Sequence, residues 1–211
     1  MVTGRKLIRL PALVSSILAP LLFVVGLAVV AVATPGYDPV RTTISELAAV
    51  GSPTRVAATI LFIATALCHF VTITFARGIG IIGRIVFLCG ALASLAIAAL
   101  PLPAHNGSSS AHDTAAIVGF VLLAAWPLFG MRFRRDFPWI VRPVGSLLGT
   151  VVLTAICLWF LVIWTSTSLG YVGLVERIAA DAESIWPAIV CVILFTAARK
   201  RYAGVTPAED S

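Results

Sequence analysis

Long apolar runs separated by short polar intervals make up most of this chain. The runs lie at about residues 11–33, 53–76, 84–100, 113–131, 143–165 and 184–198. A helix needs roughly 20 mostly apolar residues to cross the hydrocarbon core of a bilayer, where every backbone polar group has to be bonded internally. The pattern therefore predicts an all-α, polytopic membrane protein, built as a bundle of six transmembrane helices.

The composition agrees with this pattern. Of the 211 residues, 60% are hydrophobic and 11% are charged, and the mean hydropathy is +1.05. Soluble domains have about 45–50% apolar and about 25% charged residues. We expect a single six-span domain at residues 11–198, a basic N-terminus at residues 1–10, and a tail at residues 199–211 that is basic and then disordered.

The first apolar run allows two interpretations. Ala31, Val32 and Ala33 resemble the small-residue cleavage site of a signal peptide. The run is longer than the roughly 7–15 residues of a signal h-region, however, and is long enough to span a bilayer. We favour a retained first helix.

Charge distribution predicts the orientation. Six spans place both termini on one side, and twelve of the fifteen basic residues fall at the termini or in the intervals on that same side. By the positive-inside rule that side is cytoplasmic, which predicts a multi-pass membrane protein with both termini in the cytoplasm. The net charge of +6 then orients the chain in the bilayer and does not indicate binding of nucleic acid.

The first outer interval, residues 36–47, contains the densest group of polar side chains. Asp38 followed by Pro39 is typical of a helix start, and Gly51 of a stop, so we expect a short amphipathic helix at the extracytoplasmic interface. Arg41, Ser45 and Glu46 would lie on its polar side. Asp38 and Glu46 can be explained as caps, whereas capping does not explain Arg41 or Ser45.

The second outer interval offers metal-ligand chemistry. His105 and His112 lie within this interval, residues 101–112, and Asp113 follows it directly. Imidazole nitrogens and carboxylate oxygens can complete a tetrahedral zinc site, with Asp38 or Asp113 as the carboxylate. Alternatively, Asp113 caps the fourth span together with Ser110. We expect His105, His112 and Asp38 to lie near one another at the outer face.

The third outer interval, residues 173–183, predicts a second amphipathic helix. Arg177 and Asp181 are four residues apart and can pair, whereas Glu176 has no local partner. Within the spans, His69 is a notable ionisable residue. We favour a packing role for it, with a functional role as the alternative.

Residues 35–47 (PGYDPVRTTISEL) and 173–178 (GLVERI) carry a family resemblance. They resemble the two signatures of an uncharacterised bacterial six-helix family catalogued as domain of unknown function 998. The resemblance extends from about residue 13 to residue 198 and implies a six-span membrane protein with a polar outer face. It implies no established activity.

Three functions remain open. The first is binding or handling of a lipid head group or small amphiphile by the outer polar residues. The candidate ligand-binding residues are Asp38, Arg41, Ser45, Glu46, His105, His112, Asp113, Glu176 and Arg177. The second is an enzyme, either a metal-assisted hydrolase or one with Ser45 as nucleophile and His112 as base. The third is a scaffold that acts in a homo-oligomer or with a membrane-protein partner.

Overall fold

A computed structural model describes residues 7–166 and 170–203 of the chain. Within these residues, six helical segments are long and apolar enough to cross a membrane, which confirms the predicted multi-pass, all-α architecture. The spans are α1 with its continuation (Leu10–Val32), α3 (Arg55–Phe75), α4 (Ile81–Ala99), α5 (Ser110–Phe129), α6 (Pro143–Thr165) and α7 (Val172–Ala203).

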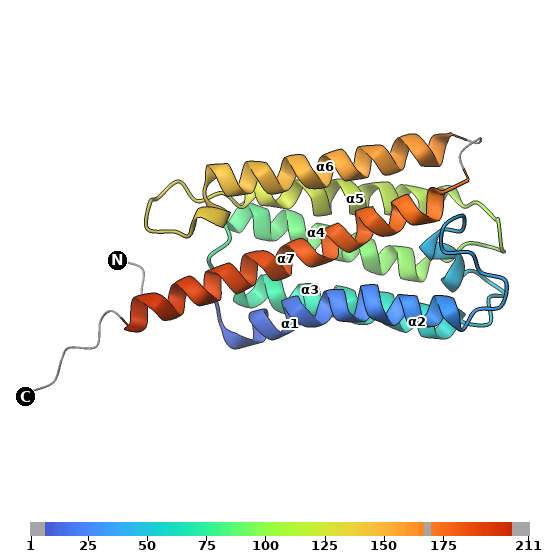
Figure 1. Cartoon of the computed structure of the whole chain (residues 1–211), viewed down its shortest axis with the longest axis horizontal. Helices are drawn as coiled ribbons and strands as arrows, with labels where there is room; N and C mark the ends of the chain where they lie inside the picture. Colours follow the sequence, from blue (N-terminus) through green and yellow to red (C-terminus); the bar gives the residue numbers. More distant parts are fainter. Residues whose placement is uncertain (1–6, 167–169, 204–211) are drawn as a thin grey trace, which may run out of the picture.

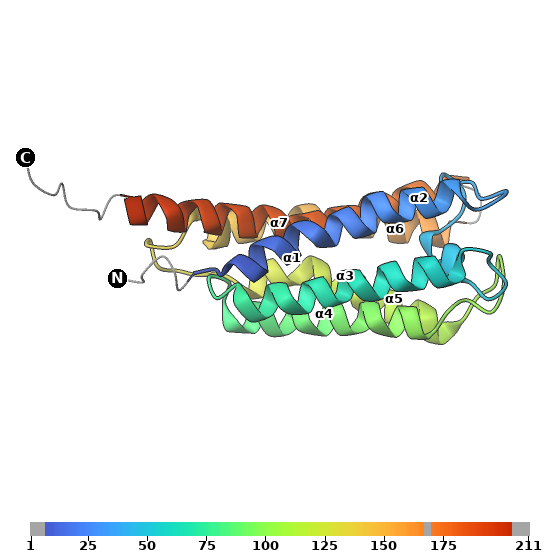
Figure 2. The ribbon, with the colours of Figure 1, turned by 90° about the horizontal axis from the view of Figure 1, so that it is seen from below.

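The spans form a closed ring. Each span packs on the next one along the chain, and α7 closes the ring by packing on α1. Figures 1 and 2 show two layers, with α3, α4 and α5 in one and α1, α6 and α7 in the other. The start of α1 and the end of α7 lie at the same end of the bundle (Figure 1). We call the opposite end, formed by residues 33–54, 100–109 and 170–171, the distal end.

The first span changes its helical winding at a proline. It consists of α1 (Leu10–Pro20), the π-helix η2 (Leu21–Gly26) and α2 (Leu27–Val32). Pro20 has no backbone N–H, and its ring crowds the carbonyl one turn earlier, so the regular hydrogen-bond pattern cannot continue past it. The wider turn of η2 lets the span go on without ending.

The two halves of the bundle are filled differently. Near the termini, Phe87, Trp126 and Leu194 are buried in a hydrophobic core, and the rings of Phe87 and Trp126 stack with centroids 5.0 Å apart. Toward the distal end, two cavities lie among α3, α4, α5, α6 and α7. Ser45, His112 and Glu176 therefore line a cavity.

The helix predicted at Asp38 does not form. Residues 38–43 make turns, and the segment contains only the 3₁₀ helix η3 (Ile44–Ala48). The backbone N–H of Ile44 donates to the Glu176 carboxylate of α7 at 2.5 Å, where an α-helix would use a carbonyl four residues earlier. Thr43 is the N-cap of η3, but its side chain makes no capping bond, so capping does not explain Glu46.

The separate amphipathic helix predicted at residues 173–183 is part of α7. This helix runs unbroken from Val172, so the last span starts about one third of its length earlier than the sequence suggested. The acidic residues of this segment suggested a solvent-exposed face. In the structure, Glu176 and Glu183 are buried on the inner face of α7.

Candidate functional site

Ser45 and His112 form the centre of the site. The Ser45 Oγ lies 2.9 Å from the Nε2 of His112. The other ring nitrogen of His112, Nδ1, lies 2.7 Å from the carbonyl oxygen of Leu100. The three groups come from η3, the first turn of α5 and the end of α4, and they meet at the distal end.

The Leu100 carbonyl determines which nitrogen of the neutral imidazole carries the proton. A carbonyl oxygen can only accept, so the Nδ1 of His112 donates to it. The Nε2 then has a free lone pair, and the Ser45 hydroxyl donates to it. Leu100 is the C-terminal cap of α4, where the last carbonyls of a helix lack partners within the helix.

Local capping places His112. Ser109 is the N-cap of α5, and its hydroxyl accepts from the backbone N–H of His112 at 3.4 Å. The cap predicted at Ser110 is therefore one residue off. The His112 side chain is 5% exposed, so its ring is fixed by its two hydrogen bonds and by burial.

Three contacts hold η3 against the bundle independently of Ser45. Glu176 accepts from the N–H of Ile44, as described above, and is itself buried. Glu46 contacts the ring of His105 and accepts from the backbone N–H of Asn106 at 3.3 Å. Ile44, Leu47 and Ala48 are buried in a cluster with residues of α2 and α3.

Arg177 contacts the loop before η3 and not Asp181. Its Nη2 donates to the Tyr37 hydroxyl, its Nε donates to the Pro39 carbonyl at 3.2 Å, and the guanidinium lies 5.4 Å from the centre of the Tyr37 ring. The predicted Arg177–Asp181 pair is thus replaced by contacts to the loop. Burial raises the pKa of Tyr37 to about 12, with Arg177 opposing the rise. The phenol therefore stays protonated, and its one O–H hydrogen is shared between the carbonyl oxygens of Thr42 and Thr43.

The predicted zinc site does not form. Within the described residues, no group of three or more His, Cys, Asp or Glu side chains is arranged to hold a metal ion. Both ring nitrogens of His112 are already bonded, His105 pairs with Glu46, and Asp38 accepts from the N–H of Val40 and lies 3.6 Å from Arg41. Asp113 lies in the first turn of α5, next to His112 in sequence.

A groove runs from Ser45 and His112 along α5 and α6. Its volume is about 770 Å³. Arg41, Asn106 and Asp113 contribute to its polar end, and its remaining wall is mainly apolar. The apolar wall includes Ile117, Phe120, Val121, Ala124 and Ala125 of α5 and Leu158, Phe160, Leu161 and Trp164 of α6. Val121 and Leu158 are more than half exposed, so the groove opens to the side of the bundle that faces lipid.

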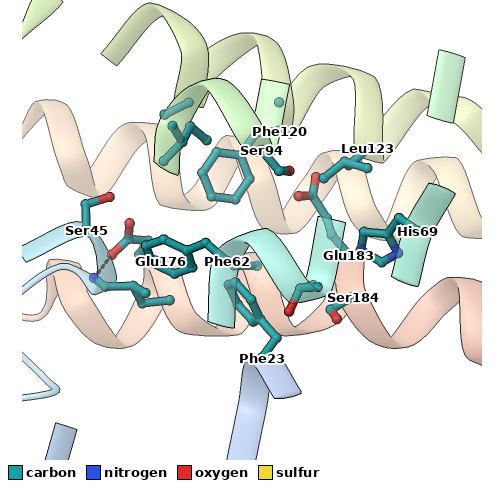
Figure 3. Close-up of a pocket in the computed structure, with 16 residues that line it drawn as sticks. Phe23, Ser45, Phe62, His69, Ser94, Phe120, Leu123, Glu176, Glu183 and Ser184 are labelled. Atoms are coloured by element: carbon teal, nitrogen blue, oxygen red, sulfur yellow. Dashed lines mark hydrogen bonds between the residues drawn. The ribbon is translucent and has the colours of Figure 1, made fainter. Parts of the chain in front are cut away.

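A second cavity of about 100 Å³ lies inside the ring. Ser45, Ala116, Phe120 and Glu176 line both this cavity and the groove, so the two spaces share a wall. Figure 3 shows Ser45 and Glu176 at one end of the inner cavity and His69, Glu183 and Ser184 at the other.

The far end of the inner cavity contains buried polar groups that the sequence does not favour as site residues. His69 Nδ1, Thr65 Oγ1 and Ser184 Oγ are buried without a hydrogen-bond partner among the described residues. Glu183 accepts from the thiol of Cys157 at 3.3 Å. The sequence favours a packing role for His69, an ionisable residue within a span. Its ring does pack on Phe87, with centroids 5.1 Å apart.

These features define a class: a six-span helical membrane protein with a histidine-centred polar site at one end of a lateral apolar groove. Residues 17–193 match the model of the family described as protein of unknown function (DUF998), and the chain belongs to that family. The resemblance found in the sequence is thereby confirmed. No curated protein and no solved structure matches the chain.

Proposed function

We propose that the protein binds a single amphiphile, with its acyl chain in the groove and its head group at the distal end. The observation that carries the proposal is the composition of the groove, which is polar around Ser45 and His112 and apolar beyond them. Ligand pockets of about 300–1,000 Å³ with mainly apolar walls and a few convergent polar groups are typical of small-molecule sites.

The dimensions of the groove suit a lipid. Its lining on α5 extends from His112 to Ala125, which corresponds to about 20 Å along a helix axis. Because the groove opens toward lipid, an acyl chain can enter it sideways from the bilayer.

Arg41 supports recognition of an anionic head group. Its side chain is 75% exposed, and its closest ionic contact is with Asp38 at 3.6 Å. Because this ion pair is long, the guanidinium can form two hydrogen bonds to phosphate or carboxylate oxygens. Arg177 does not have this freedom, because the Tyr37 hydroxyl and the Pro39 carbonyl already occupy it.

The proposal includes an orientation. The intervals at the end of the bundle near the termini contain Arg77, Arg132, Arg134 and Arg135, and the positive-inside rule assigns such an end to the cytoplasm. The groove's polar end is then extracytoplasmic in a bacterial plasma membrane, the setting that the family resemblance suggests.

Lipid analysis of purified protein tests the proposal. Lipids that remain after detergent purification are identified by mass spectrometry for the wild type, Arg41→Ala and the control Arg55→Ala. Arg55 is an exposed arginine at the same end of the bundle. We expect one anionic class to be enriched in the wild type and in Arg55→Ala and to fall about tenfold in Arg41→Ala, the loss expected for one hydrogen bond to a charged group. Identical profiles in the wild type and Arg41→Ala would argue against the proposed head-group contact.

A further inference from the structure

We propose that Ser45 is a nucleophile and His112 its general base, and that the pair cleaves a carboxylic ester of the bound amphiphile. The inference rests on the proposed function, since the groove would hold the acyl chain of the substrate. It goes further by assigning a reaction, acyl transfer to Ser45 followed by hydrolysis.

The geometry meets the requirements for an activated serine. A nucleophile needs a base within about 2.6–3.2 Å and a third group that orients the base. The Ser45 Oγ to His112 Nε2 distance is 2.9 Å, and the Leu100 carbonyl fixes the ring from the other side at 2.7 Å.

A backbone carbonyl replaces the carboxylate of a serine–histidine–aspartate triad. Much of the loss seen when an amide replaces that carboxylate arises because the histidine then adopts the wrong tautomer. A carbonyl avoids this loss, because it can only accept and so keeps the proton on Nδ1. It supplies less charge to stabilise the imidazolium, so we expect slower chemistry than in a triad with an acid.

A purely structural role does not account for the position of Ser45. Glu176 and Glu46 already hold η3 in place through Ile44 and Asn106. Ser45 lines both the groove and the inner cavity. The carbonyl group of an ester lying in the groove can therefore reach the hydroxyl oxygen.

The reaction balances with the ester and water alone. The Ser45 Oγ attacks the ester carbonyl carbon while His112 Nε2 takes the hydroxyl proton. The carbon–oxygen bond to the alcohol then breaks, and the alcohol leaves with the proton from Nε2, which forms an acyl-serine. Water attacks this acyl group, His112 again takes and returns one proton, and the carboxylic acid leaves free Ser45 behind. Arg41, which lines the same groove, is a cation available to the oxyanion.

Covalent labelling with an alkyl fluorophosphonate tests the inference on the full chain in lipid nanodiscs. The probe reacts with activated serines, and the site is located by peptide mass spectrometry. We expect labelling of Ser45 in the wild type, none at this position in Ser45→Ala, and a rate lowered by about 10²–10⁴-fold in His112→Asn, the usual contribution of a general base. The asparagine amide can still donate to Leu100. The control Ser52→Ala, at the same end of the bundle, keeps the wild-type rate.

The outcomes separate the two proposals. If Ser45 stays unlabelled while the protein still copurifies with its lipid, the nucleophile is refuted and binding stands. If neither lipid nor label is found, both proposals fail. Labelling of His112→Asn at the wild-type rate also overturns the inference, because His112 would then not act as base. A further expected result is hydrolysis of a long-chain fluorogenic ester by the wild type and not by Ser45→Ala, with both proteins folded at the assay temperature.

Discussion

A backbone carbonyl determines the tautomer and the orientation of the His112 ring. Its two nitrogens face an acceptor, the Leu100 carbonyl, and a donor, the Ser45 hydroxyl. Both are available because of local secondary structure: α4 ends at Ala99, so the carbonyl of its C-cap Leu100 has no partner within the helix, and η3 places Ser45 opposite the ring. The residue types are ordinary, and the proposed reactivity of the pair depends on this arrangement.

The sequence identified Ser45 and His112 but not what orients them. Both residues were candidates because they lie in polar intervals between spans. Leu100 was not, because a backbone carbonyl contributes the same atoms at every position and leaves no sequence signal. Whether η3 and α5 would touch also depends on how the loops fold back, which periodicity does not determine.

Two threonines of α3 provide a test of the inner cavity at the residue scale. Thr65 Oγ1 has no partner among the described residues, whereas Thr72 Oγ1 lies 2.8 Å from Ser15 Oγ and donates to the Cys68 carbonyl at 2.9 Å. Replacing an unpaired hydroxyl by a methyl is nearly neutral, while breaking a paired one costs about 0.5–1 kcal/mol. We expect Thr65→Val to change the free energy of unfolding by less than about 0.5 kcal/mol, and Thr72→Val to lower it by about 1 kcal/mol.

Denaturant unfolding in detergent micelles measures both threonine variants. A loss in Thr65→Val as large as that in Thr72→Val would show that the Thr65 hydroxyl has a partner in the inner cavity, such as an ordered water.

At the scale of elements, the spans were predictable and the polar intervals were not. Apolar runs of sufficient length determine membrane helices, because lipid leaves the backbone no alternative. In the intervals that constraint is absent, and tertiary contacts decide. Tyr37, Ile44 and Glu176 hold the first interval in turns where local signals favoured an α-helix, and burial of Val175 and Ala179 extends α7 to Val172.

Glycines determine how closely neighbouring helices approach. A Cβ added at Gly149 of α6 would lie 2.4 Å from the Trp186 ring of α7, whereas one at Gly119 of α5 would be 3.6 Å from Ala93. We expect Gly149→Ala to destabilise the fold by about 1–3 kcal/mol, because a rigid ring has to move. Gly119→Ala should be neutral or stabilise it by up to about 1 kcal/mol, since alanine favours the helix.

Thermal unfolding of the two glycine variants in the same detergent tests the α6–α7 contact. Equal transition temperatures for Gly149→Ala and the wild type would mean that Trp186 does not pack against α6 as described.

At the scale of the whole molecule, the ring of spans is packed at one end and open at the other. Phe87, Trp126 and Leu194 are buried in a core at the end near the termini. From the distal end the groove extends along α5 as far as Ala125, and the inner cavity extends as far as Leu123. Because polar intervals meet a lateral opening at this end, we favour the proposed amphiphile site over a scaffold role.

The lipid stoichiometry of a groove-filling variant tests the central claim most directly. Ala125 lines the groove on α5, whereas Val118 is an exposed residue of the same helix outside that lining. Native mass spectrometry would compare the wild type, Ala125→Phe and the control Val118→Phe. We expect one bound lipid per chain in the wild type and in Val118→Phe, and a loss of about tenfold or more in Ala125→Phe, because the added ring occupies the path of the acyl chain. Equal lipid occupancy in all three proteins, each folded, would contradict the assignment of the groove as the amphiphile site.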